Sequence, residues 1–129
     1  MNIQFIATKV FAGTEENSWT VGFADHEFET KEYLFLQRAS VVEQQDVDIG
    51  HDSYHVEIND QSCSCYGGIE SAKLWRNRIE IAFLPKASTV LQNTKIVKIQ
   101  FDVDDLTFAA LSNHLALVLS GVDIFQRCE

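Results

Sequence analysis

Side chains that could bind a metal gather in the middle of this 129-residue chain. They are His51, His55, Cys63 and Cys65, which span fifteen positions. Structural zinc sites favour ligand pairs about two to four residues apart on a turn or helix, whereas Cys63 and Cys65 are separated by a single residue. The spacing therefore favours free cysteines and a solvent-facing His55, and we expect no metal and no other cofactor.

The same residues include the types that a small cysteine/histidine hydrolase needs. A cysteine nucleophile requires an adjacent base that a third group orients, and His55 could serve either Cys63 or Cys65. However, no nucleophile-elbow motif or glycine-rich phosphate motif accompanies them. The pair Gly67-Gly68 is typical of a turn whose backbone needs positive φ. A hydrolase is therefore the less favoured alternative.

Carboxylates are also frequent in this part of the chain. Those in the polar segment are Glu43, Asp46, Asp48 and Asp52. Paired carboxylates can perform acid and base catalysis, but acids in such a polar segment are normally solvated. We therefore predict no catalytic residue and no enzymatic activity.

Alternation of apolar and polar residues predicts a chain made mainly of strands. The expected strands are residues 2–12, 18–25, 30–39, 52–59, 69–75, 78–84 and 95–103. The strand at 30–39 is apolar on both faces, so we expect it to be central. Two polar loops, at residues 40–51 and 60–68, flank the strand at 52–59, and loops on a rigid scaffold are where functional groups concentrate.

The apolar spacing changes to that of a helix after Asp104, a natural N-cap. The expected apolar stripe is Phe108, Leu111, Leu115, Val118 and Val122, with Gly121 near the end of the helix. A short helical turn is expected at 86–91, after Pro85. The predicted fold is α+β, a single domain over residues 1–129. It has one strongly bent antiparallel sheet of about six or seven strands, with the C-terminal helix packed on one face.

The charge balance restricts the class of partner. Ten Lys and Arg stand against 19 Asp and Glu, a formal net charge of −9. An acidic surface repels nucleic acid and attracts a basic protein, although acidity can also serve solubility alone. No apolar run approaches the roughly 20 residues that span a bilayer, and the N-terminal residues lack the blocks of a secretory signal. We therefore expect a cytoplasmic protein with no membrane partner, whose three cysteines are free thiols; the oligomeric state is not predicted.

Several stretches of the sequence resemble the immunity protein 10 family of bacterial polymorphic toxin systems. They are YLFLQRA, QQDVDIGHDSYHVEINDQSCSCYGGIESAKL, NRIEIAF and FDVDDLTF, which together extend over most of the chain. The resemblance implies a cytoplasmic protein that neutralises a cognate toxin by occupying it, without catalysis. Cys63 and Cys65 lie outside the family pattern. A small structural or interaction domain with an unknown partner remains the alternative.

Two sets of residues follow as hypotheses. We expect the toxin-binding surface to consist of Glu43, Asp46, Asp48, Asp52, His55, Glu57, Asp60 and Tyr66. We expect Gln37, Arg38, Gln61 and Glu70 to form a buried polar network that holds the two loops to the sheet. Tyr54 and Trp75 are expected in the core, and Tyr66 is either a lid over the edge of the core or an anchor for the partner.

Overall fold

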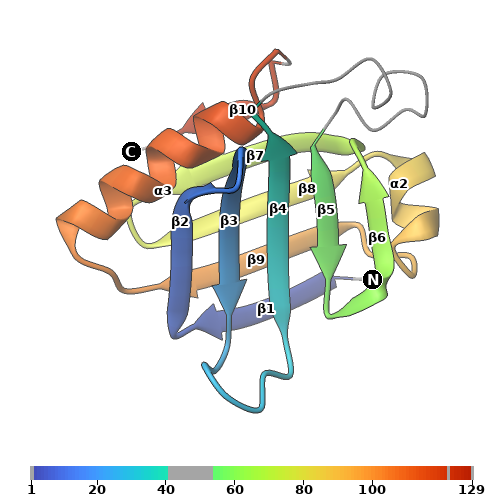
Figure 1. Ribbon diagram of the computed structural model, residues 1–129. Coiled ribbons are helices and arrows are strands. Elements are labelled where there is room, and N and C mark those ends of the chain that lie inside the picture. Colours follow the sequence, from blue (N-terminus) through green and yellow to red (C-terminus); the bar gives the residue numbers. More distant parts are fainter. Residues whose placement is uncertain (1, 41–53, 122, 129) are drawn as a thin grey trace.

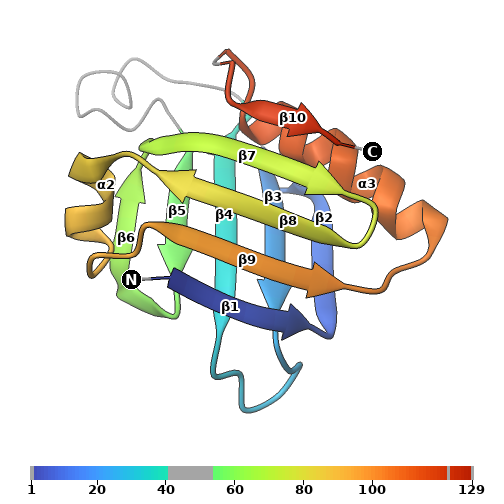
Figure 2. The ribbon, with the colours of Figure 1, turned by 180° about the vertical axis from the view of Figure 1, so that it is seen from behind.

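Two five-stranded sheets pack face to face, and a long helix contacts strands of both sheets (Figures 1 and 2). The computed structural model describes residues 2–40, 54–121 and 123–128. The first sheet contains β1 (Asn2–Ala7), β7 (Ile69–Trp75), β8 (Arg78–Phe83), β9 (Ile96–Phe101) and β10 (Phe125–Arg127). The second contains β2 (Lys9–Glu15), β3 (Ser18–Ala24), β4 (Tyr33–Ala39), β5 (His55–Ile58) and β6 (Asp60–Tyr66). The helices are α2 (Pro85–Val90) and α3 (Asp105–Val118).

The strands are ordered β1-β9-β8-β7-β10 in the first sheet and β2-β3-β4-β5-β6 in the second. The strands of the two sheets cross at a large angle (Figure 1). The mixed α+β class is confirmed, but the expected single bent sheet is wrong. The expected purely antiparallel pairing is also wrong, because β1 runs parallel to β9 and β10 runs parallel to β7. As expected, β4 is central in its sheet.

The chain passes from one sheet to the other at Thr8. The Thr8 N–H donates to Ala24 O at 3.0 Å, and its hydroxyl donates to Asp25 O at 2.6 Å. Residues 2–12, expected as one strand, are therefore divided between β1 and β2. The alternation continues across Thr8, so it contains no sign of the change of partner.

The expected loop at residues 60–66 is strand β6, which pairs with β5. Asn59, with φ of 62°, makes the connection, and the register shifts between Glu57 and Ile58. The serines and cysteines of this segment show little apolar alternation, so the sequence pattern did not predict a strand. Pairing with β5 decides its conformation.

The core is formed by the inner faces of both sheets together with α3. Phe23 from β3 meets Phe101 from β9, with 5.9 Å between the ring centroids. Leu34 and Leu36 of β4 are fully buried, and so are Ile79, Ile81, Val97 and Ile99 of β8 and β9. Tyr54 is buried as expected, whereas Trp75 is only partly buried, with the Arg78 guanidinium 4.1 Å from its ring centroid.

Helix α3 contacts β2, β3, β4 and β10. Leu111, Leu115 and Val118 of the expected stripe are buried; Val122 lies outside the described residues. Arg38 Nη1 donates to the carbonyl oxygens of Val118 at 3.2 Å and Ser120 at 2.6 Å. A guanidinium at a helix C-terminus satisfies carbonyls that lack helical partners and opposes the helix dipole.

No helix of the described residues is long and apolar enough to cross a membrane.

Asp104 is the N-cap of α3, as expected: its Oδ1 accepts from the Thr107 N–H at 2.7 Å. Hydrogen bonding from Thr107 holds the pKa of the Asp104 carboxyl below its ordinary value. Replacing Asp104 with alanine should lower the thermal midpoint by roughly 2–6 °C at pH 7. A carboxyl whose pKa is lowered in the folded state stabilises the fold at pH values above its unfolded pKa. This stabilisation is lost as the pH falls through the lower pKa of the folded state.

Circular dichroism melts at pH 7 and at strongly acidic pH would measure this effect. The exposed neighbour Asp102 supplies the control, and Asp102→Ala should leave the midpoint nearly unchanged. If Asp104→Ala lowers the thermal midpoint equally at both pH values, the capping role is contradicted.

Candidate functional site

The two cysteines of β6 face the opposite side of the sheet from His55. Cys63 is 3% exposed, and partly buried Cys65 directs its Sγ to Gly67 O at 3.5 Å. Burial raises the pKa of both thiols, which disfavours the thiolate. Because Val56 pairs with Cys65 while His55 pairs with Tyr66, the sheet separates the imidazole from these thiols. The cysteine–histidine pairing of the hydrolase alternative therefore does not form.

The candidate metal ligands His55, Cys63 and Cys65 lie within the described residues. Within residues 2–40, 54–121 and 123–128, no group of three or more His, Cys, Asp or Glu side chains could hold a metal ion. His51 lies outside these ranges.

The outer face of the β2–β6 sheet, turned toward the viewer in Figure 1, carries a different set of side chains. The register aligns them in rows across the strands. One row is Phe11, Gly22, Phe35, Glu57 and Ser64. The next is Gly13, Thr20, Gln37, His55 and Tyr66. We call this surface the outer face.

A tyrosine anchors the carboxylate of the first row. The Tyr33 hydroxyl donates to Glu57 Oε2 at 2.6 Å, and both side chains are partly buried. Burial and the hydrogen bond to this carboxylate raise the pKa of Tyr33, so the phenol stays protonated as the donor. Glu57 is therefore an acceptor held in one position on the outer face.

Tyr66 lies against His55 in the second row, with 5.1 Å between the ring centroids. The Tyr66 side chain is 44% exposed. It contacts His55 on the outer face, and it also lines a cavity with Leu84 and Ala87 beside α2. Half-exposed aromatic side chains are frequent among the residues that anchor protein partners.

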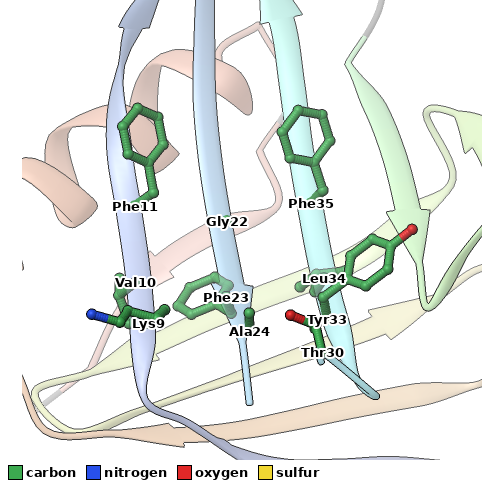
Figure 3. A pocket seen from close by; sticks show the side chains of 10 residues that line it. All are labelled: Lys9, Val10, Phe11, Gly22, Phe23, Ala24, Thr30, Tyr33, Leu34 and Phe35. Carbon is green, nitrogen blue, oxygen red and sulfur yellow. The ribbon is translucent and has the colours of Figure 1, made fainter. Parts of the chain in front are cut away.

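A groove of about 560 Å³ crosses β2, β3 and β4 on the outer face (Figure 3). The rings of Phe11 and Phe35 stand on either side of Gly22. Lys9, Thr30 and Tyr33 line its other end. Phe11 is 45% exposed, so this apolar surface is open to solvent.

The groove was not predicted from the sequence, although one signal for it was present. The strand at residues 30–39, which contains β4, is apolar on both faces, and from this we predicted only that it would be central in its sheet. Leu34 and Leu36 do face the core, but Phe35 lines the groove. Its neighbours across the sheet, Phe11 and Gly22, come from two earlier strands, so only the register reveals the site.

An acidic loop, residues 25–32, connects β3 to β4 beside the groove. It contains four carboxylates and one lysine, a net charge of −3 with His26 neutral. Glu27 also forms an ion pair with Lys9, at 3.3 Å between Oε2 and Nζ. Phe28, within this loop, is 80% exposed.

The sequence matches the protein family described as Immunity protein 10 over residues 6–109. The chain belongs to the immunity protein 10 family. The matched range includes the whole of the β2–β6 sheet, and therefore the outer face and its groove. No curated protein sequence matches the chain.

The residues expected to bind the partner of this immunity-family protein have several locations. His55, Glu57 and Tyr66 share the outer face. Asp60 is exposed at the start of β6, where its carboxylate accepts from the Ser62 N–H and hydroxyl, both at 2.8 Å. Hydrogen bonds from Ser62 hold the pKa of Asp60 below its ordinary value. Glu43, Asp46, Asp48 and Asp52 lie outside the described residues.

The four residues expected to form a polar network have separate locations and partners. Arg38 binds the end of α3, and Gln37 Nε2 donates to Thr20 Oγ1 at 3.4 Å. Gln61 and Glu70 are exposed on β6 and β7, so they do not complete a buried network with Arg38. The separation arises because β6 ends one sheet while β7 belongs to the other.

Proposed function

We propose that this member of the immunity protein 10 family binds a cognate bacterial toxin in the cytoplasm and neutralises it by occlusion, without a catalytic step. This proposal rests on the side chains of the outer face of the β2–β6 sheet. It presents aromatic side chains and one anchored acid, Glu57, on a sheet whose other side is core. Side chains held on a rigid sheet lose little conformational freedom on binding.

The clustering of apolar and aromatic groups supports a binding role. Single exposed apolar residues are normal at a protein surface, whereas a contiguous apolar patch marks an interaction site. Phe11, Phe35 and Tyr33 border one groove, and the His55–Tyr66 pair lies on the same face. Aromatic groups beside charged groups are the composition expected of an interface centre and its rim.

The charge of the chain supports a basic toxin. A net charge of −9 accelerates encounter with a cationic partner and weakens binding to an acidic one. Glu57, held by Tyr33, provides a defined acceptor on the outer face. We propose that it acts together with His55, Asp60 and Tyr66 and with the acids of the preceding segment. Those acids are Glu43, Asp46, Asp48 and Asp52.

Charge reversal tests the proposed surface. Replacing Asp46, Asp48 and Glu57 together with lysine should weaken binding to the toxin by at least about tenfold, because three attractions become repulsions. The same variant should fail to protect cells that express the toxin. Isothermal titration with the catalytically disabled toxin of the adjoining reading frame measures the first effect, and growth under co-expression measures the second.

The matched control makes the same change of charge elsewhere. Glu70, Asp102 and Asp123 are exposed and lie on other parts of the molecule, so their combined replacement with lysine should keep protection. Protection retained by the first variant, with both variants folded, would contradict the surface assignment. If the unaltered protein neither binds nor protects, a structural domain with another partner is the better description.

A further inference from the structure

We propose that the groove above Gly22 receives one large apolar side chain of the toxin, carried by a segment that also presents lysine or arginine. This inference rests on the proposed function. It adds the chemistry of the contact and assigns a specificity role to Gly22, which lies outside the stretch expected to bind the partner.

Gly22 has no structural reason to be glycine. It lies inside β3, and its φ is not positive, whereas among the described glycines Gly67, Gly68 and Gly121 do have positive φ. A Cβ built on Gly22 would meet only Phe35 Cδ2, at 3.9 Å, an ordinary van der Waals distance. Glycine inside a strand weakens the strand, and it often marks a place where another molecule approaches closely. Without a side chain at Gly22, the part of the groove between Phe11 and Phe35 stays open; we call this part the hollow.

The two aromatic walls set the size of the hollow. Strands β2 and β4 lie on either side of β3, so their backbones are roughly 10 Å apart. The Phe11 ring leans along its own strand, where its Cζ would be 3.1 Å from a Cβ on Gly13. It therefore leaves the space above Gly22 free, as Figure 3 shows. The gap between Phe11 and Phe35 matches one leucine, methionine or aromatic side chain.

The charges around the groove indicate which residues should flank the apolar side chain in the toxin segment. Glu57 is the direct neighbour of Phe35 across the sheet, and the loop at residues 25–32 adds a net charge of −3 at the other end. Lys9, which lines the groove, is paired with Glu27 of this loop, so the loop and Lys9 together carry a net charge of −2. An apolar side chain flanked by cations therefore complements this groove, whereas an acidic segment would be repelled.

Filling the hollow tests the inference. Replacing Gly22 with valine or leucine should weaken binding of the catalytically disabled toxin from the adjoining reading frame by about 10- to 100-fold, because the anchor side chain loses its burial. The thermal midpoint of the valine variant should equal or exceed that of the unaltered protein, because a β-branched residue suits the strand. Isothermal titration and thermal melts measure the two quantities.

The outer face of the other sheet supplies the control. Ala82 lies in β8, the central strand of that sheet, and is likewise partly exposed. Ala82→Val adds a β-branched side chain there and should leave binding unchanged. A second variant, Phe11→Ala, removes one wall of the groove and should also weaken binding, which keeps the test valid if the leucine variant is poorly folded.

The outcomes separate the two proposals. If the unaltered protein does not bind the toxin, the proposed function fails and this inference fails with it. If the unaltered protein binds, while Gly22→Val and Phe11→Ala bind equally well, only the groove inference is overturned. Binding that is weakened in both variants but retained by Ala82→Val supports the inference.

Discussion

Replacing Phe23 with alanine is expected to lower the free energy of unfolding by about 3–5 kcal/mol. Phe23 is 1% exposed and packs against Phe101 across the interface between the sheets. Its ring is therefore one of the groups that join the two sheets. Loss of the ring removes buried apolar area and leaves a cavity that a rigid sheet cannot close. Because domains are commonly stable by only about 5–15 kcal/mol, this change removes a large part of the total.

Urea denaturation followed by fluorescence or circular dichroism measures the loss. Phe28→Ala makes the same chemical change at a residue that is 80% exposed, and it should alter the free energy of unfolding by no more than about 0.5 kcal/mol. Equal effects of the two substitutions would contradict the assignment of Phe23 to the core. Phe28→Ala also shows, in the binding assay, whether the acidic loop contributes an apolar contact.

Replacing Gly68 with alanine is expected to lower the free energy of unfolding by about 2–5 kcal/mol. Gly68 has φ of 91°, and a Cβ at this position would overlap the Cβ of Ala87 in α2. Its carbonyl oxygen also accepts from the Leu84 N–H at 2.9 Å. The residue lies between β6 and β7, where the chain passes from one sheet to the other. Backbone strain and a steric clash therefore add at one junction.

Gly121→Ala separates these two causes. Gly121 has a similar φ of 83°, but a Cβ there would have no neighbour within 4 Å. Its substitution should cost only the backbone strain, about 1–2 kcal/mol. Denaturant titration of both variants gives the difference, which is the cost of the clash with α2. Equal losses would show that α2 moves away without cost.

The two faces of the β2–β6 sheet have separate chemistry because successive residues of a strand point to opposite sides. In β5, Val56 and Ile58 face the core, while His55 and Glu57 face outward. In β6, Cys63 faces the core and Tyr66 lies beside His55. His55 and the cysteines Cys63 and Cys65, which are close in sequence and suggest a metal site or a hydrolase, therefore lie on opposite faces of the sheet. The groups that remain together on the outer face are suited to binding.

Local patterns in the sequence predicted the elements well. The hairpin of β7 and β8, the short helix after Pro85, the N-cap at Asp104 and the inward face of α3 all depend on residues near one another in the chain. Their determinants are local: period-two or period-3.6 apolar spacing, turn residues and capping side chains. The family resemblance was also carried by contiguous stretches, and it is confirmed by the match over residues 6–109.

The pairing of the strands was decided by the tertiary structure. Alternation specifies which face of a strand is apolar but not which strand is its neighbour, so one bent sheet and two packed sheets have the same local signature. The parallel partners of β1 and β10 are distant in sequence, and no local signal marks the change of sheet at Thr8. The same limitation concealed β6, whose polar residues become a strand through pairing with β5.

The stretch of His, Cys and acidic residues, read alone, determined that the middle of the chain is polar and lacks a recognised catalytic motif. The full composition determined that the chain as a whole is acidic. The groove between Phe11 and Phe35, by contrast, exists only because β2, β3 and β4 align these residues around Gly22. The physical reason is that composition and local spacing are properties of the chain, whereas a surface is assembled by register among strands distant in sequence.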